Sequence, residues 1–326
     1  MMTTTHSLDM QVYTKQRREA VESALEAILT KWEKDLRVPK VLAESMRYSL
    51  MSPGKRMRAL LCIAACETVL HINNGAQSEK TDFNLLEQKI FEQVSALACS
   101  IEMIHAMSLI HDDLPCLDND DMRRGQATNH VVFGEAMALL AGDALILRAI
   151  ENIIEGTPAS VSKDGVLEVI KELSIAAGAP GMVGGQVFDL VKDLDVKRIH
   201  DEKTGALIAF SLWSGARLAT YDNRASATQE QLDGLRQFGF VLGLAFQIAD
   251  DLLDINGSVE VIGKTPGKDA ASDKVTWVSI FGEDGARAKL SQLMEQGENL
   301  LKDHNLKFAP LPVLSELLSF AITRSH

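Results

Sequence analysis

The sequence is poor in the residues that build sheets and covalent cross-links. Aromatic side chains make up 5% of the 326 residues, and the chain holds eight prolines and four cysteines. Few aromatics beside abundant Ala, Leu, Glu, Lys and Met are typical of helices rather than sheets. No stretch of alternating polar and apolar residues is long enough to indicate a strand. The composition therefore predicts an all-α fold.

The four cysteines do not form the pattern of a zinc site or of a disulfide framework. Cys62 and Cys66 lie one helical turn apart, whereas Cys99 and Cys116 stand alone in apolar or mixed segments. No second pair of Cys or His follows at zinc-binding spacing. We expect all four cysteines to be reduced and buried.

An excess of positive charge is also missing. The 33 Lys and Arg residues against 45 Asp and Glu leave a net charge of −12, which argues against nucleic acid or an anionic membrane as the main partner. No apolar run of the roughly 18 residues that a membrane span needs is evident, so a soluble protein is expected. The N-terminal segment lacks the pattern of a signal peptide or of an obvious transit peptide, which favours the cytoplasm, with the plastid stroma as the alternative.

Apolar residues recur with helical spacing almost throughout the chain. Helices are predicted over Tyr13–Lys34, Val38–Met51, Met57–Leu70, Asn84–Leu114, Phe133–Glu155, Val161–Ala176, Lys203–Ala219, Glu230–Ile255, Ala286–Lys302 and Leu311–Thr323. Breakers rich in Gly, Pro or polar residues separate them. Because no linker-like change in composition divides the chain, we expect a flexible tail at 1–10 and one helical domain at 11–326.

Two of the long apolar helices end in clusters of aspartate. The later cluster holds Asp250, Asp251 and Asp254; at about 100° per residue, Asp250 and Asp254 share one helix face and Asp251 flanks them. Like charges one turn apart destabilise a helix unless a cation lies between them, and carboxylate oxygens are the ligands that Mg²⁺ prefers. By itself, such a cluster is better explained as an acidic helix end exposed to solvent, but a second cluster changes that interpretation.

The earlier cluster consists of Asp112, Asp113, Asp118, Asp120 and Asp121. On a regular helix Asp112 and Asp118 would be about 240° apart. Pro115 cannot continue the helical hydrogen bonds, so we expect a bulge that returns Asp118 to the face of Asp112. Arg123 and Arg124 follow, and their planar guanidinium groups suit phosphate oxygens. Carboxylates for a metal beside arginines for an anion indicate a metal–diphosphate site, although a patch of surface salt bridges is the simpler alternative for the charges alone.

Three basic stretches could complete such a site. One begins a helix at Pro53–Arg58, where free N–H groups and the helix dipole also favour anions. The second is Lys203-Thr204 near the start of another helix, and the third is a loop punctuated by Gly and Pro beyond the second Asp cluster. Their basic residues are Lys55, Arg56, Arg58, Lys203, Lys264, Lys268 and Lys274.

In their order along the chain, these motifs resemble those of the trans-isoprenyl diphosphate synthases, the farnesyl and geranylgeranyl diphosphate synthase family, and most closely the geranylgeranyl type of plants and bacteria. The resemblance covers nearly the whole chain after the N-terminal tail. It rests on GKRMR at Gly54–Arg58, MIHAMSLIHDDLPCLDNDDMRRG at Met103–Gly125, AGDAL at Ala141–Leu145, GGQVFDL at Gly184–Leu190, KTGAL at Lys203–Leu207, FQIADDLLD at Phe246–Asp254 and GKTPGKD at Gly263–Asp269. It implies an all-α bundle of roughly ten or more helices, with the two Asp-rich motifs facing each other across a deep, apolar-lined cavity, and a homodimer.

The resemblance also implies a Mg²⁺ cofactor and roles for individual residues. The metal ligands would be Asp112, Asp118 and Asp250, supported by Asp113, Asp251 and Asp254. Arg123, Lys203 and Lys264 would hold an allylic diphosphate, and Lys55, Arg58, His105 and Arg124 would hold isopentenyl diphosphate. Lys203, Thr204 and Gln247 would face the allylic cation, and Lys274 completes the substrate-binding set. Without the resemblance, a hydrogen-bonded core histidine would be the preferred interpretation of His105.

The expected reaction is elongation of dimethylallyl, geranyl or farnesyl diphosphate by ionisation, condensation with isopentenyl diphosphate and proton loss to the departing pyrophosphate. A terpene cyclase would carry an Asn/Ser/Glu pattern in place of Asp250–Asp254. A non-catalytic subunit of a heteromeric synthase, the other alternative, typically lacks one or both Asp motifs.

The expected main product is geranylgeranyl diphosphate, with farnesyl diphosphate as the alternative. Met107 lies five residues before Asp112, about 7.5 Å along the helix axis. Similar farnesyl-producing enzymes commonly have a bulky aromatic here, which stops the growing tail early. A flexible Met next to the small Ser108 leaves room for a longer tail.

Overall fold

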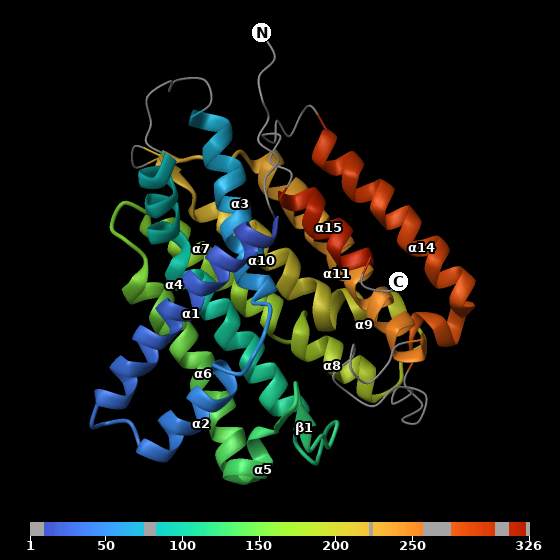
Figure 1. Ribbon diagram of the computed structural model, residues 1–326, viewed down its shortest axis with the longest axis horizontal. Coiled ribbons are helices and arrows are strands. Elements are labelled where there is room, and N and C mark those ends of the chain that lie inside the picture. Colours follow the sequence, from blue (N-terminus) through green and yellow to red (C-terminus); the bar gives the residue numbers. More distant parts are fainter. Residues whose placement is uncertain (1–9, 75–82, 222–223, 257–274, 304–312, 324–326) are drawn as a thin grey trace.

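The computed structural model describes residues 10–74, 83–221, 224–256, 275–303 and 313–323 (Figure 1). The helices are α1 (Met10–Lys34), α2 (Lys40–Leu50), α3 (Met57–Asn74), α4 (Phe83–Asp112), α5 (Asn129–Phe133), α6 (Glu135–Gly156), α7 (Lys163–Ala177), α8 (Met182–Leu190), α9 (Val196–His200), α10 (Ala206–Leu218), α11 (Gln229–Asn256), α14 (Trp277–Lys302) and α15 (Val313–Thr323). A π-helical turn, η1, spans Asp201–Gly205. Two antiparallel hairpins pair β1 (Met122–Arg123) with β2 (Gln126–Ala127) and β3 (Thr220–Tyr221) with β4 (Arg224–Ala225). The all-α prediction is confirmed.

Three helices and both hairpins escaped the sequence prediction. The helices α5, α8 and α9 span only five, nine and five residues, too few for a clear helical period, and Gly184-Gly185 inside α8 is typical of a loop. Gly185 is instead required by close packing, because a Cβ there would lie 2.1 Å from the backbone nitrogen of Lys203. α14 begins earlier than predicted and continues across a kink at Gly282, where φ is 71°.

The core is built around α3, α4 and α10, which pack against one another, while α6 covers α4 and α11 covers α10 (Figure 1). In α3 every residue from Ala59 to Leu70 is buried. α3 and α10 approach so closely that a Cβ on Gly215 would lie 2.0 Å from the carbonyl oxygen of Cys62.

Two expectations drawn from the sequence were wrong in part. The stretch Gln88–Asp112 of α4 is long and apolar enough to cross a membrane by length and composition, but 72% of its most apolar window is buried inside the protein, as in a core helix. Cys62, Cys66 and Cys99 are buried as predicted, and burial raises the pKa of the Cys99 thiol to about 12. Cys116 is exposed instead, because it lies in the turn that follows α4.

Candidate active site

The first Asp-rich segment turns back on itself directly after α4. The helix ends at Asp112, before Pro115, so the expected bulge is replaced by a helix end. The backbone N–H of Asp118 then donates to the carbonyl oxygen of Asp112 at 2.8 Å. Asn119, with a left-handed φ of 51°, closes the turn. Asp118 thus returns to Asp112 as the sequence predicted, although by a different backbone route.

Asp112 lies in a field of mixed charge. Burial raises the pKa of its carboxyl, and the neighbouring Asp118 raises it further, while Lys203 and Arg123 act in the opposite direction. Lys203 belongs to η1, so this coupling places the end of α4 beside the π-helical turn. An anionic carboxylate at this position is costly unless a cation approaches it.

Asp113 points to a different partner from Asp112. Its side chain is buried, and both of its oxygens accept hydrogen bonds from Nε of Arg123, at 2.8 and 2.9 Å, while Nη2 donates to Oδ1 at 2.6 Å. Burial acts to lower the pKa of Arg123, but the hydrogen bonds that it donates to Asp113, together with the negative charges of Asp113, Asp112 and Asp118, outweigh burial and raise the pKa. Asp113 therefore orients Arg123, a role that the sequence did not indicate.

The hairpin that carries Arg123 and Arg124 is anchored to α2 through its second strand. Tyr48 donates from its hydroxyl to the carbonyl oxygen of Ala127 at 2.7 Å. The buried Asn129 side chain accepts from the hydroxyl of Ser45 and donates to the hydroxyl of Ser49, both at 2.8 Å. These contacts join segments about 80 positions apart in the sequence, and they fix the position of the hairpin that carries the two arginines.

Three of the residues that the resemblance assigned to isopentenyl diphosphate lie together between α3, α4 and the hairpin. Burial lowers the pKa of His105 well below its usual value, and Arg58 and Arg124 lower it further. Burial also lowers the pKa of Arg58 to about 10, against an opposing effect of Glu102. Within the described part of the chain, the buried Nε of Arg58 has no hydrogen-bond partner. Arg58, a half-buried cation with an unsatisfied donor, is suited to bind an anion.

Lys203 and Thr204 are presented by the π-helical turn η1 at the start of α10. Nζ of Lys203 donates to Oδ2 of Asp189 in α8 at 2.6 Å. Asp189 lies in the quoted GGQVFDL motif, but the sequence analysis gave it no role. Thr204 is buried and Gln247 of α11 is half-buried, and α11 packs against η1. This packing brings the three residues predicted to face the allylic cation to one part of the fold.

In the second Asp cluster, as in the first, adjacent carboxylates have different partners. Asp250 is half-buried and contributes to the electrostatic environment of Arg58 across the site. Asp251 is buried, and its Oδ2 accepts the backbone N–H of Trp277 at 2.7 Å, which caps the start of α14. His200 Nε2 lies 3.7 Å from the same oxygen. Asp254 is half-buried, and Lys264, Lys268 and Lys274 lie outside the described residues.

The predicted metal ligands are not gathered into one cluster. Among the residues that the structure describes, no group of three or more His, Cys, Asp or Glu side chains could hold a metal ion. The donor chemistry nevertheless fits Mg²⁺, because two carboxylates come together at the end of α4, where the charge of Asp118 acts to raise the pKa of Asp112. Asp250 offers a third carboxylate near Arg58.

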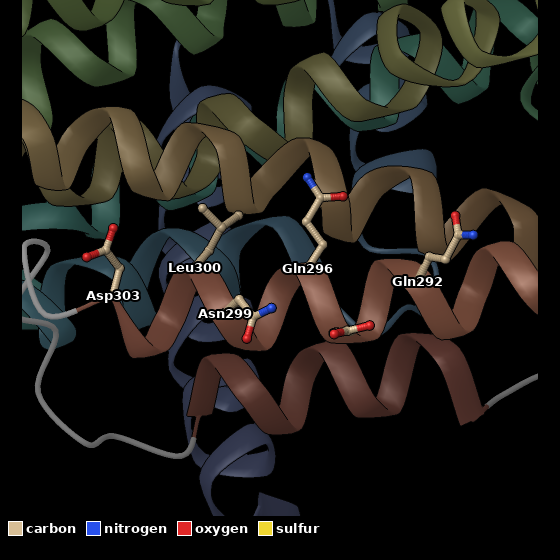
Figure 2. Close-up of a pocket in the computed structure, with 6 residues that line it drawn as sticks. Gln292, Gln296, Asn299, Leu300 and Asp303 are labelled. Atoms are coloured by element: carbon tan, nitrogen blue, oxygen red, sulfur yellow. The ribbon is translucent and has the colours of Figure 1, made fainter.

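Two cavities of the described structure lie outside the region between the Asp-rich segments. An open cavity of about 480 Å³ is lined by Gln292, Glu295, Gln296, Asn299, Leu300 and Asp303 of the C-terminal region. Figure 2 shows Gln292 and Gln296 projecting from their helix toward the neighbouring one. Its lining has no cation and is unsuited to a diphosphate. A smaller cavity lies between α2, α4 and the β1–β2 hairpin, with Tyr48, Asp113 and Arg123 in its wall.

Comparison with known proteins gives consistent matches over most of the chain. The model of the polyprenyl synthetase family matches residues 39–306. The chain is 40% identical over 323 residues to the chloroplastic geranylgeranyl pyrophosphate synthase of Catharanthus roseus, covering 96% of this chain and 82% of that one. It is 38% identical over 316 residues to the farnesyl diphosphate synthase of Bacillus subtilis, covering 95% and 96%. A crystal structure of an FPP/GFPP synthase from Zymomonas mobilis superimposes with a TM-score of 0.72 at 32% identity, covering 96% of this chain and 99% of that one.

Neighbouring aspartates should respond in opposite ways to the same substitution. Asp113→Asn should lower the free energy of unfolding by about 3 kcal/mol, because it leaves Arg123 buried without its carboxylate. Asp112→Asn should leave stability unchanged or raise it, since it removes a carboxylate that burial and Asp118 disfavour. Urea unfolding of both variants measures the difference. Equal destabilisation by the two substitutions would contradict the division of roles.

Proposed function

Because the chain belongs to the polyprenyl synthetase family and is a short-chain prenyltransferase of the farnesyl and geranylgeranyl diphosphate synthase type, we propose that it elongates dimethylallyl, geranyl and farnesyl diphosphate with isopentenyl diphosphate, mainly to geranylgeranyl diphosphate. One observation carries the assignment of the site: Asp112, at the end of α4, lies in the electrostatic field of Lys203 and Arg123, and His105 of the same helix lies in the field of Arg58 and Arg124.

The allylic diphosphate binds in the region of Asp112, Arg123 and Lys203. Asp113 and Asp189 hold the two cations in place, so little reorganisation is needed when the diphosphate arrives. Mg²⁺, held by Asp112, Asp118 and Asp250, would neutralise negative charge on the leaving pyrophosphate. Lys264 joins this set from outside the described residues.

Isopentenyl diphosphate binds near the start of α3, where Arg58 is half-buried and Lys55 and Arg124 are exposed. Arg58 contributes its unsatisfied Nε donor, and His105 and Arg124 lie in the same electrostatic environment. Lys55 lies exposed just before α3, and Lys274 joins from outside the described residues. The cation cluster fixes the diphosphate and directs the double bond of this substrate toward the allylic carbon.

The residues at η1 stabilise the carbocation that forms when the allylic diphosphate departs. The hydroxyl of Thr204, the side-chain amide of Gln247 and the backbone of the π-helical turn supply oriented dipoles. A π-helical turn widens the helix by one residue and displaces the backbone groups from the regular i to i+4 pairing. The departing pyrophosphate accepts the proton in the final step, so no protein base is required.

The proposed reaction predicts a strict dependence on the acidic side chains. The purified protein should convert labelled isopentenyl diphosphate and an allylic diphosphate to prenyl diphosphates when Mg²⁺ is present. Asp112→Asn and Asp250→Asn should each lower turnover by roughly 10²–10³ with the fold intact, because each removes a charge that acts on the transition state. Circular dichroism of the variants is the control for folding.

An inactive wild-type protein would favour the alternative of a non-catalytic subunit in a heteromeric synthase. Activity close to wild type in both Asp variants would instead contradict the assignment of Asp112 and Asp250 as metal ligands, without contradicting the proposed reaction class.

Product length depends in this proposal on residues of α4 that precede Asp112. Met107 is 5% exposed, and Met103 and Ile104 further along the helix are 0% and 2% exposed. Ser108 next to Met107 donates its hydroxyl to the carbonyl oxygen of His105 at 2.9 Å. The relatives include both a geranylgeranyl and a farnesyl synthase, so their names do not decide the product. The proposal therefore bases the choice of product on these residues of α4.

An aromatic residue at position 107 should shorten the product. Met107→Tyr and Met107→Phe should shift the main product from geranylgeranyl to farnesyl diphosphate, because a rigid ring blocks the tail where the Met side chain moves aside. Met107→Leu, which conserves the volume, is the matched control. Chromatography of the dephosphorylated products measures the ratio. If the wild type stops at farnesyl, or the aromatic variants leave the ratio unchanged, another wall of the site sets the length.

A homodimer through α6 and α7 is the second part of the proposal. Leu140, Leu147 and Ile154 repeat every seven residues along α6 and are 52%, 70% and 59% exposed. Leu167 and Ile175 of α7 are also exposed, at 65% and 42%, and α7 packs against α6. A stripe of this kind, exposed on a single chain, is typical of an interface between identical subunits.

A charge in the centre of the stripe should separate the subunits. Leu147→Glu is expected to convert the dimer to a monomer in multi-angle light scattering, because a carboxylate would be buried without a partner. Leu36, which is 100% exposed between α1 and α2, provides the matched control in Leu36→Glu. A wild-type protein that is already monomeric would overturn this part of the proposal.

A further inference from the structure

The backbone around Lys55 is held rigidly before α3 begins. Gly54 packs against the Arg124 guanidinium, since a Cβ at this glycine would lie 2.6 Å from Nη1. Arg56 has a left-handed φ of 52°, a conformation that a non-glycine residue rarely adopts. Its buried side chain lies 3.6 Å from the Glu102 carboxylate. Because Gly54 and Arg56 are both held by these contacts, the backbone position of Lys55 is fixed.

The tip of that side chain meets the C-terminal helix. Nζ of Lys55 lies over the ring of Phe320, 4.6 Å from its centroid. Phe320 belongs to α15, which packs against α11, α14 and α3 (Figure 1). The ring is 40% exposed, so it is not a full member of the core. Lys55 and Phe320, which are far apart in the sequence, thus meet at the predicted isopentenyl diphosphate site.

An aromatic ring differs from a carboxylate as a partner for a cation. The ring face attracts the ammonium group through its quadrupole and restricts where it lies. It carries no formal charge, so it does not compete with a diphosphate for the positive charge of the lysine. Lys203 and Arg123 pair instead with the carboxylates of Asp189 and Asp113. Phe320 is therefore a neighbour that can orient the Lys55 ammonium group.

We propose that Phe320 is a positioning residue that holds Lys55 in place for the diphosphate of isopentenyl diphosphate, so that α15 completes a binding region begun by α3. The inference rests on the proposed function, because Lys55 must bind that substrate. It adds a residue and a helix to which no role was assigned. Phe320 itself touches neither substrate and acts through Lys55.

Steady-state kinetics of the full-length protein tests the proposal. Phe320→Leu should raise KM for isopentenyl diphosphate roughly 2- to 5-fold, the effect expected for one cation–π contact at a partly exposed site. The value of kcat and the KM for the allylic diphosphate should not change. Phe320→Tyr, which keeps the ring face, should restore the wild-type KM. A loss of fold would instead change all three parameters.

A double-variant cycle shows whether the ring acts through the lysine. In a Lys55→Ala background, Phe320→Leu should have no further effect on the KM for isopentenyl diphosphate. Phe281 of α14 provides the control, because its exposed ring packs on Trp277, with the centroids 4.9 Å apart, rather than on Lys55. Phe281→Leu should leave the KM for isopentenyl diphosphate unchanged.

The outcomes separate this inference from the proposed function. The inference is overturned if Phe320→Leu does not change KM, if it raises the KM values of both substrates equally, or if its effect persists without Lys55. An inactive wild-type protein would instead overturn the proposed reaction. An active protein with an unaltered KM in Lys55→Ala would show that Lys55 does not bind isopentenyl diphosphate, and the role of Phe320 would fall with it.

Discussion

The pairing of functional cations with carboxylates outside the predicted metal set is the constraint on which the site depends. Arg123 is held by Asp113, and Lys203 is held by Asp189. Each pair joins two elements that the chain alone would not bring together, so the cation occupies its position before any ligand arrives. Asp251 acts similarly through the backbone of Trp277, where it fixes the start of α14. Each Asp-rich motif thus combines anchoring carboxylates with carboxylates that are predicted to bind the metal.

Backbone strain accumulates in the same loops. Four non-glycine residues of the described chain have a positive φ, and three of them, Arg56, Asn119 and Arg124, lie in the segments that carry the predicted ligands. Such conformations cost of order 1–3 kcal/mol each and persist only where surrounding contacts enforce them. Here the contacts are the ion pair of Arg56 with Glu102, and the hydrogen bond from Arg124 to the Pro53 carbonyl. These strained conformations lower the stability of the fold, but they place the charged side chains of Arg56 and Arg124.

The sequence predicted what depends on local pattern. Long helices with a clear apolar period were found, and the end of α4 returns Asp118 to Asp112 as expected. The sequence did not predict features that depend on contacts between residues far apart in the chain. α8 was missed because Gly184-Gly185 resembles a loop until the close approach of Lys203 is known. The different roles of Asp112 and Asp113 were also unpredictable, since adjacent carboxylates differ only in which distant cation each one meets.

The apolar character of α4 has a consequence for how the chain is made. Synthesis proceeds from the N-terminus, so α4 leaves the ribosome before α6 and α10, which cover it, have been translated. During that interval a segment as hydrophobic as a membrane span is exposed to solvent. The preceding helices α1, α2 and α3 also contact α4, but they do not replace the contacts that α6 and α10 make. Newly made chains therefore need either rapid docking of the later helices or a chaperone that holds α4 until they emerge.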